Sequence, residues 1–240
     1  MIKTSKYVVG YVDLLGAKSK TIQDDENNKN LNSLNDLYQM AKKTREFMRD
    51  ELKNPNLHIK IFSDNVAVVQ KIGATEYDAG AAVIGFLLHF QFFAWMKEQW
   101  LMRGCVTCGD LYVDDAFVWG KALIEAYTGE NELAIYPRIV LTPKLLGKLH
   151  LDKFKKSEQS IDMDFDGEYY LRFYDILNIY KPVSRKKRLA DIRENLVAML
   201  KDTQKQPKLK QKTVWLVHQH NAYCAANDMP DFAIELRKQI

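Results

Sequence analysis

A short apolar segment that ends in an aspartate and a glycine constrains this chain more than any other feature of its sequence. Residues Tyr7 to Val12 read YVVGYV, and their β-branched and aromatic side chains predict a buried strand. Asp13 follows with no evident cation beside it, and Gly16 then predicts a turn into a helix. Because a carboxylate at the end of an apolar strand costs free energy unless it is paired, we expect a partner for Asp13.

A second segment has the same form. Residues 58–62 and 66–69 predict two strands, and the polar turn between them carries Asp64 at its tip. Two carboxylates on adjacent strand ends suit a pair of divalent cations that hold the phosphates of a nucleotide, since Mg²⁺ and Mn²⁺ prefer hard oxygen ligands.

The composition is that of an ordinary soluble globular protein, with 47% hydrophobic and 28% charged residues in 240. This length allows one elaborated domain or a domain with a helical extension, and we favour the second, with domains at residues 1–180 and 181–240. The net charge of +4 is mild and does not by itself indicate a nucleic-acid partner. The basic residues gather in two runs, at 181–188 and 201–212.

Nothing in the sequence predicts export or membrane insertion. The longest apolar run, 79–95, is interrupted by His89 and Gln91 and is expected to be too short to span a bilayer, so we expect a cytoplasmic protein. Three cysteines fit a reducing compartment. Cys105 and Cys108 form a C-x-x-C spacing inside a strand-like run, where packing is a better interpretation than redox chemistry or zinc binding.

The remaining pattern alternates helices with strands. Helices are expected after Gly16 and over 34–52, 79–99, 121–132 and 144–156, with Asn54-Pro55 ending the second of these. Strands are expected in a hairpin over 101–118, at 137–141 and at 169–177, and polar loops at 23–32 and 157–168. This order predicts an α+β, palm-like domain whose antiparallel or mixed sheet has helices on one face. Two more helices, 189–200 and 212–226, are expected at the C-terminus.

Taken together, these motifs resemble the class III nucleotidyl cyclases, and within them the short bacterial pyrimidine cyclases of the Pycsar anti-phage systems. The family's aromatic-x-Asp-Ile/Leu-x-Gly pattern is matched by YVDLLG at 11–16. Its hairpin aspartate is matched by FSDN at 62–65, and its arginine-glycine strand by Arg103-Gly104. The resemblance runs from about Tyr7 to Ile139, with a looser echo at 214–216.

The resemblance implies a ferredoxin-like palm, C-terminal helices and a defined reaction. A 3′-hydroxyl attacks the α-phosphate of UTP or CTP, which yields the 3′,5′-cyclic monophosphate and pyrophosphate. By resemblance, Asp13 and Asp64 bridge two Mn²⁺ or Mg²⁺ ions, and the backbone carbonyl of Leu14 completes one shell. One ion then lowers the pKa of the attacking hydroxyl and the other neutralises the triphosphate.

The same resemblance assigns the substrate contacts. Lys60 aligns with a base-selecting strand position and Phe117 with its partner, while Arg103 contacts phosphate or base. Plainer interpretations stay open for several of these residues, namely a solvated lysine or arginine, a core tyrosine, a helix cap and a turn aspartate. The full set of expected substrate-binding residues is Tyr11, Leu15, Gly16, Ala17, Lys60, Ser63 and Arg103, and Arg138 is a weaker candidate.

One departure from the family matters. Many class III cyclases carry an asparagine and an arginine in the helix after Trp-Gly, and here Ile124 and Thr128 hold the aligned positions. Either Arg103 or another cation supplies the missing charge, or the enzyme is weak or inactive. The pattern Glu125-Ala126-Tyr127-x-x-Glu130 instead looks like the pyrimidine-cyclase subgroup.

The resemblance also implies partners, and two other classes of function stay open. It implies a homodimer with sites at the subunit interface, an effector that binds the cyclic nucleotide, and neither a nucleic-acid nor a membrane partner. A palm-domain polymerase or nuclease would need a basic groove with stacking aromatics, whereas the lysines here lie mainly in the C-terminal segment. A non-catalytic nucleotide sensor is suggested by Ile124 and Thr128.

Overall fold

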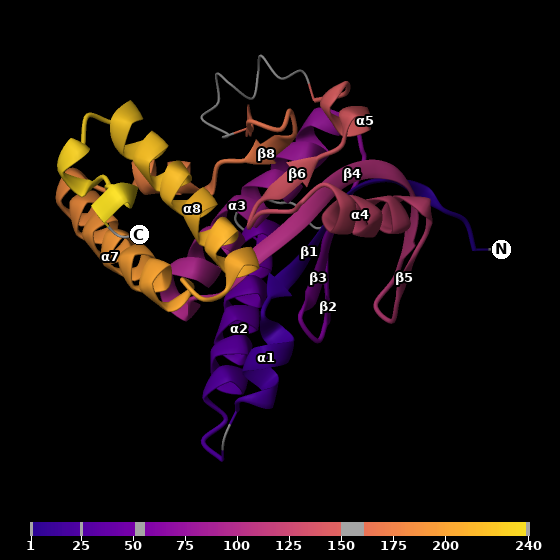
Figure 1. Ribbon diagram of the computed structural model, residues 1–240. Helices are drawn as coiled ribbons and strands as arrows, with labels where there is room; N and C mark the ends of the chain where they lie inside the picture. Colours follow the sequence, from indigo (N-terminus) through magenta and orange to yellow (C-terminus); the bar gives the residue numbers. More distant parts are fainter. Residues whose placement is uncertain (1, 25, 51–55, 150–160, 239–240) are drawn as a thin grey trace. The chain divides into compact units, whose positions relative to one another are not determined.

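The computed structural model describes residues 2–24, 26–50, 56–149 and 161–238 (Figure 1). The chain divides into two compact units, Met1–Arg172 and Phe173–Ile240. Unit 1 contains the whole sheet and both aspartates discussed above. Unit 2 is helical.

Unit 1 is built on a mixed sheet in which β1 (Ser5–Leu15) occupies a central position. In hydrogen-bonded order the sheet runs β2-β3-β1-β4-β6-β8-β7, with β5 paired to β4. The β1–β3 and β1–β4 pairs are antiparallel, and the β4–β6 pair is parallel. The other strands are β2 (Leu57–Phe62), β3 (Asn65–Lys71), β4 (Leu101–Val113), β5 (Val118–Trp119), β6 (Ile139–Leu141), β7 (Ile161–Met163) and β8 (Tyr169–Leu171). The α+β class predicted from the sequence is therefore confirmed.

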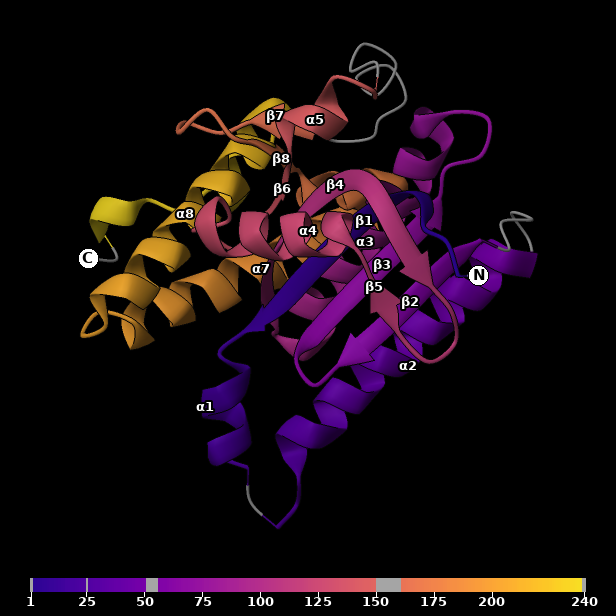
Figure 2. The same ribbon diagram turned by 90° about the vertical axis from the view of Figure 1, so that its right-hand side faces the viewer.

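Helices cover both faces of this sheet, so the expectation of helices on one face was wrong. Val9 of β1 packs with Ala122 and Ala126 of α4 (Lys121–Glu132) on one face. The next residue, Gly10, faces α3 (Glu76–Glu98), where a Cβ atom would come within 2.6 Å of Leu87 Cδ1. Because successive residues of a strand point to opposite faces, a strand buried at consecutive positions, as β1 is from Tyr7 to Gly10, needs cover on both sides (Figures 1 and 2).

The long helix α3 is apolar on nearly every side. Its N-terminus is capped by Thr75, whose side chain accepts a hydrogen bond from Asp78 N. By length and composition it could cross a membrane, which corrects the expectation that the apolar run is too short, and 67% of its most apolar window is buried in the protein. The second helix on this face, α2 (Lys29–Asp50), packs against α3 and β2.

The N-terminus of α2 lies earlier than the sequence suggested. Both carboxylate oxygens of Asp24 accept hydrogen bonds, one from Asn30 N and one from Leu31 N, each at 2.9 Å. These bonds satisfy amides of the first helical turn. The polar run 23–32 is therefore a loop only as far as residue 28, while the stop expected at Asn54-Pro55 lies outside the described residues.

The expected strand over 169–177 was half wrong. Only Tyr169–Leu171 is a strand, and a 3₁₀ helix, η1 (Phe173–Ile179), follows in unit 2. Phe173, Tyr174, Ile176 and Leu177 are all buried, a spacing that suits one helical face and that a strand would split between two.

The expectations around this strand also changed. The expected loop 157–168 contains β7, and its first four positions lie outside the described residues. Of the helix expected over 144–156, the described residues contain the single turn α5 (Pro143–Leu146). Residues 150–156 of that range are not described. The expected strand 137–141 is shorter, since β6 starts at Ile139.

Two helices make up most of unit 2, as predicted, and both start earlier than expected. They are α7 (Pro182–Asp202) and α8 (Pro207–Ala226), each with proline in its first turn. Proline is favoured there because its missing N–H would have no partner in any case. The basic run 201–212 is thus mostly helix. Short helices α1 (Ala17–Ile22) in unit 1 and η2 (Pro230–Phe232) and η3 (Leu236–Lys238) in unit 2 complete the fold.

Candidate active site

Asp13 lies near the end of β1, where three neighbouring strands bring polar side chains together. The register places Asp13 opposite Asn65 of β3 and opposite Arg103 of β4. Directly opposed residues project to the same face of a sheet, here the face that α4 covers. The partner that the sequence left open is therefore Arg103, whose Nε lies 3.7 Å from Asp13 Oδ2.

Asp64 sits at the tip of the β2–β3 hairpin and is tied to β1. Leu14 N donates a hydrogen bond of 3.0 Å to the carbonyl oxygen of Asp64, and Asn65 Nδ2 donates one of 3.1 Å to its carboxylate. The tight turn requires a left-handed Ser63, at φ 55°. The structure thus brings both predicted aspartates to the same end of the sheet.

Tyr38 of α2 supports this turn, and sequence reasoning missed it. Its hydroxyl donates to the carbonyl oxygen of Ser63. This hydrogen bond fixes the backbone of Ser63 and leaves its side chain exposed. Burial, and then the nearby Asp64, raise the pKa of Tyr38, which therefore acts as a neutral hydrogen-bond donor.

Glu130 is the second residue that sequence reasoning assigned no role. It is a buried carboxylate at the end of α4, and its Oε1 lies 2.5 Å from Arg103 Nε. The guanidinium is thus closer to Glu130 than to Asp13. Three carboxylates and one guanidinium, from Asp13, Asp64, Glu130 and Arg103, leave a formal charge of −2 at this end of the sheet. The sequence signal for Glu130 is its spacing, since it lies three residues after Tyr127 and therefore on the same face of the helix.

Tyr11 lines the same face of β1 and contacts both neighbouring elements. Its hydroxyl donates to Asn65 Oδ1 at 2.7 Å, and its ring meets the edge of Tyr127 of α4 at 5.6 Å. Burial, followed by the negative charges of Glu130 and Asp13, raises the pKa of Tyr11 to about 12. Tyr11 is therefore both packed and hydrogen-bonded to the asparagine that holds Asp64.

Three of the expected substrate-binding residues, Leu15, Gly16 and Ala17, follow β1 residue Leu14 directly in the chain. Leu15 is the last residue of β1, Gly16 is left-handed at φ 82°, and Ala17 begins α1. No side chain caps this helix. Gly16 is exposed, and a left-handed conformation suits glycine because it has no Cβ atom.

Lys60 and Phe117 lie farther along the sheet. Lys60 is paired with Ala67, which is paired with Tyr11, so all three share the face that α4 covers, and two strand spacings of about 5 Å separate Lys60 from β1. Lys60 Nζ donates to the carbonyl oxygen of Asp115 at 2.6 Å, in the turn that carries Phe117. The Phe117 ring packs at 5.3 Å from that of Tyr112 and is 47% exposed.

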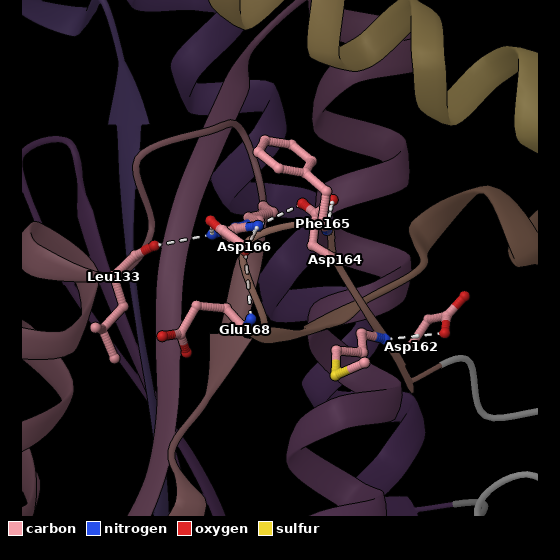
Figure 3. Close-up of polar contacts among 8 residues, drawn as sticks. Leu133, Asp162, Asp164, Phe165, Asp166 and Glu168 are labelled. Atoms are coloured by element: carbon pink, nitrogen blue, oxygen red, sulfur yellow. Dashed lines mark hydrogen bonds and ion pairs between the residues drawn. The ribbon is translucent and has the colours of Figure 1, made fainter.

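Ile124 and Thr128 of α4, which hold the positions where many class III cyclases carry an asparagine and an arginine, are exposed side chains without charge. Arg138 does not replace that arginine. Its guanidinium is fully buried and forms ion pairs with Asp164 and Asp166 of the β7–β8 turn, and it donates to Leu133 O (Figure 3). The structure therefore makes Arg138 a residue that joins elements of the fold and leaves Arg103 as the arginine beside Asp13.

The residues at the end of β1 fit divalent cations by their chemistry. Within the described ranges, no group of three or more His, Cys, Asp or Glu side chains is arranged to hold a metal. Two carboxylates and a backbone carbonyl are nevertheless hard oxygen donors, and Mg²⁺ is commonly held by one or two carboxylates together with substrate phosphates. Asp13 is 22% exposed and therefore accessible to such an ion.

The fold of unit 1 is that of the catalytic domain of nucleotidyl cyclases. One similar solved structure is the monomeric guanylyl cyclase domain of the RhoGC fusion protein from the aquatic fungus Blastocladiella emersonii, with a TM-score of 0.52 and 12% identity over 71% of this chain and 98% of that one. Another is the guanylate cyclase domain of RhGC from Catenaria anguillulae in complex with GTP, with a TM-score of 0.51 and 11% identity over the same shares. No family model and no curated protein matches the sequence.

Proposed function

We propose that this protein is a metal-dependent pyrimidine nucleotide cyclase that converts UTP or CTP to the 3′,5′-cyclic monophosphate and pyrophosphate. The observation that carries the proposal is the meeting of Asp13 and Asp64 at one end of a cyclase-like sheet, joined by the Leu14 N to Asp64 O hydrogen bond. Two Mn²⁺ or Mg²⁺ ions held there by Asp13, Asp64 and the Leu14 carbonyl would activate the 3′-hydroxyl and neutralise the triphosphate.

The protein's own residues position the reactants. Asn65 orients the Asp64 carboxylate, and Tyr11 in turn holds Asn65. Glu130 fixes the Arg103 guanidinium beside Asp13, where it is within reach of a phosphate or a base. Catalysis would then consist mainly of positioning and electrostatic stabilisation by groups fixed before substrate binds.

The pyrimidine preference rests on Lys60 and Phe117. Lys60 bridges to the turn that carries Phe117, so the two residues expected to face the base belong to one connected structure. Phe117 offers neither the acid nor the thiol expected of a purine-reading residue. We favour UTP slightly over CTP. The geometry of Lys60 and Phe117 does not distinguish the two nucleotides.

The biological role follows from the sequence resemblance. We propose that the cyclic nucleotide acts as an anti-phage signal in the cytoplasm and activates an effector that binds it. We also propose a homodimer with sites at the subunit interface. No stable contact with the effector, nucleic acid or membrane is needed for this role.

One observation favours a second candidate, a nucleotide sensor that does not turn over its ligand. The exposed Ile124 and Thr128 leave these two positions of α4 without a cation that could stabilise the transition state. Arg103, held by Glu130 at 2.5 Å, would in that case only bind the triphosphate.

The test is incubation of the purified protein with Mn²⁺ and each nucleoside triphosphate separately, with products identified by mass. We expect a cyclic pyrimidine monophosphate from the wild type and at least a hundredfold less from Asp64→Asn, which removes one ligand charge. Asp110→Asn is the matched control. It also lies on the sheet, in an exposed ion pair with Lys6, and should keep full activity.

Three other results would change the conclusion. Saturable triphosphate binding without any product supports the sensor, and a cyclic purine nucleotide refutes the pyrimidine preference. Equal product from Asp64→Asn and the wild type would exclude the proposed cation site.

A further inference from the structure

A hollow lies at the edge of the sheet, and of the side chains to which the proposed function gives a role only Lys60 lines it. It has a volume of about 310 Å³ and is lined by Lys42 and Arg45 of α2, residues 58–61 of β2 and Asp115 of the β4–β5 turn. β2 is the outermost strand of the sheet order and runs alongside α2 (Figure 2). One side of the β2 backbone is thus without a strand partner among the described residues.

Three cations gather around this pocket. Lys42 and Arg45 are three residues apart on α2 and so share a helix face, and Lys60 approaches from β2. Within the described part of the chain, none of the three lies within ion-pair distance of a carboxylate. The hydrogen bond of Lys60 goes to the backbone carbonyl of Asp115 instead. A bound anion would interact favourably with all three cations.

The pKa of His58 reflects the positive electrostatic potential around this pocket. Its side chain shares a strand face with Lys60, and the charges that act on it come from Arg45 of α2, Lys60 of its own strand and Asp115 of the turn. Burial, and then Arg45 and Lys60, lower the pKa of His58, while Asp115 opposes them. The cations therefore outweigh the single acidic group at this position.

We propose that this pocket binds a small anion that carries phosphate groups, at a site separate from Asp13 and Asp64. An arginine fork and two lysine ammonium groups are the side chains that proteins use for phosphate, the first for its geometry and the others as point charges. The volume is near the lower limit for small-ligand sites, so a diphosphate or a nucleotide fits and a nucleic-acid duplex does not. Lys60 is also one of the two base-facing residues of the proposed function, so the pocket is tested through Lys42 and Arg45, to which that function assigns no role.

The test is calorimetric titration of the full-length protein with inorganic pyrophosphate in the absence of divalent cations. We expect saturable binding by the wild type, and at least a tenfold higher Kd for the double variant Lys42→Gln/Arg45→Gln. Lys43→Gln is the matched control, because Lys43 lies on the same helix but lines a different, apolar hollow with Met40 and Phe47. The control should leave the Kd unchanged, and so should Asp13→Asn.

A second measurement separates a local effect from loss of folding. In nuclear magnetic resonance titrations, pyrophosphate should raise the pKa of His58 in the wild type, since a nearby anion favours the imidazolium form. The same addition should leave His58 unshifted in the double variant, and Arg45→Gln alone should give an intermediate result if the double variant does not fold.

The source of the phosphate is resolved by repeating the titration with UMP. Tighter binding of UMP indicates a nucleotide ligand and tighter binding of pyrophosphate indicates the free anion, and either supports the site when the double variant raises its Kd at least tenfold. Absence of saturable binding of either, or an equal Kd in the wild type and the double variant, would refute it.

Discussion

Arg138 shows how far the role of a single residue can lie from what its sequence position suggests. Its guanidinium is fully buried, while Asp164 is 6% and Asp166 27% exposed, so the cluster is mostly removed from water. The three residues join the segment before β6 to the β7–β8 turn. Breaking a buried ion pair on one side leaves an uncompensated charge, which costs much more than an exposed pair contributes.

We therefore expect Arg138→Met to lower the free energy of unfolding by about 3–5 kcal/mol in urea titrations. Lys6→Met, which breaks the exposed pair with Asp110, should lower it by less than about 1 kcal/mol. Adding Asp164→Asn and Asp166→Asn to Arg138→Met should recover part of the loss, since the buried charges are then gone. Equal losses from the two single variants would contradict this account.

The same cluster predicts a dependence on pH. The hydrogen bond from Arg138 holds the pKa of Asp166 below its usual value. A carboxyl group whose pKa is lowered by folding stabilises the protein above its unfolded pKa of about 3.9, and this contribution is lost as pH falls through the folded pKa. The difference in stability between the wild type and Arg138→Met should therefore narrow below about pH 4.

At the scale of elements, the close approach of β4 to β1 determines the geometry of the site. A Cβ atom on Gly104 would lie 2.5 Å from the backbone oxygen of Tyr11 and 2.5 Å from Val12 Cγ1. The backbone of β1 cannot shift away from this Cβ atom without a cost in free energy, because β3 pairs with its other side. Glycine at 104 thus lets Arg103, its neighbour, come up against Asp13.

Gly104→Ala is accordingly expected to cost about 1–3 kcal/mol of stability and to reduce the proposed cyclase activity more than tenfold at temperatures where the protein stays folded. Gly73→Ala is the matched control, because nothing lies within 4 Å of its Cβ position and its backbone is not left-handed. Circular dichroism melting and product formation measure the two effects. A folded Gly104→Ala with full activity would show that the separation of β1 and β4 is unimportant.

The element scale also explains what the sequence could and could not predict. The positions of Asp13 and Asp64 could be predicted from the sequence because each ends a local apolar run, and local runs define strands. The contact of Glu130 could not be predicted, because its partner Arg103 is on another element and the contact depends on how α4 packs over β4. Likewise, Tyr38 reaches Ser63 across 25 residues, and the register that places Asn65 beside Tyr11 is a property of the assembled sheet.

At the scale of the whole molecule, a group of exposed apolar side chains bears on the proposed dimer. Unit 1 exposes four large apolar side chains around the β4–β5 turn and on α4. They are Phe117, Trp119, Ile124 and Tyr127, with exposed fractions of 47, 67, 66 and 53%. Exposed apolar side chains grouped on neighbouring elements are typical of interaction surfaces, and the commonest soluble assembly is a symmetric dimer.

We expect Ile124→Glu to shift the protein from dimer to monomer in sedimentation equilibrium, because a charge in an apolar interface must be desolvated. The rate of the proposed cyclisation per subunit should fall about tenfold at concentrations where the wild type is dimeric, and should recover partly as protein concentration rises. Val183→Glu, which places the same charge at an 83% exposed position of unit 2, should change neither. If the wild type sediments as a monomer while it cyclises nucleotide at full rate, the site is complete in one chain and the dimer must be abandoned.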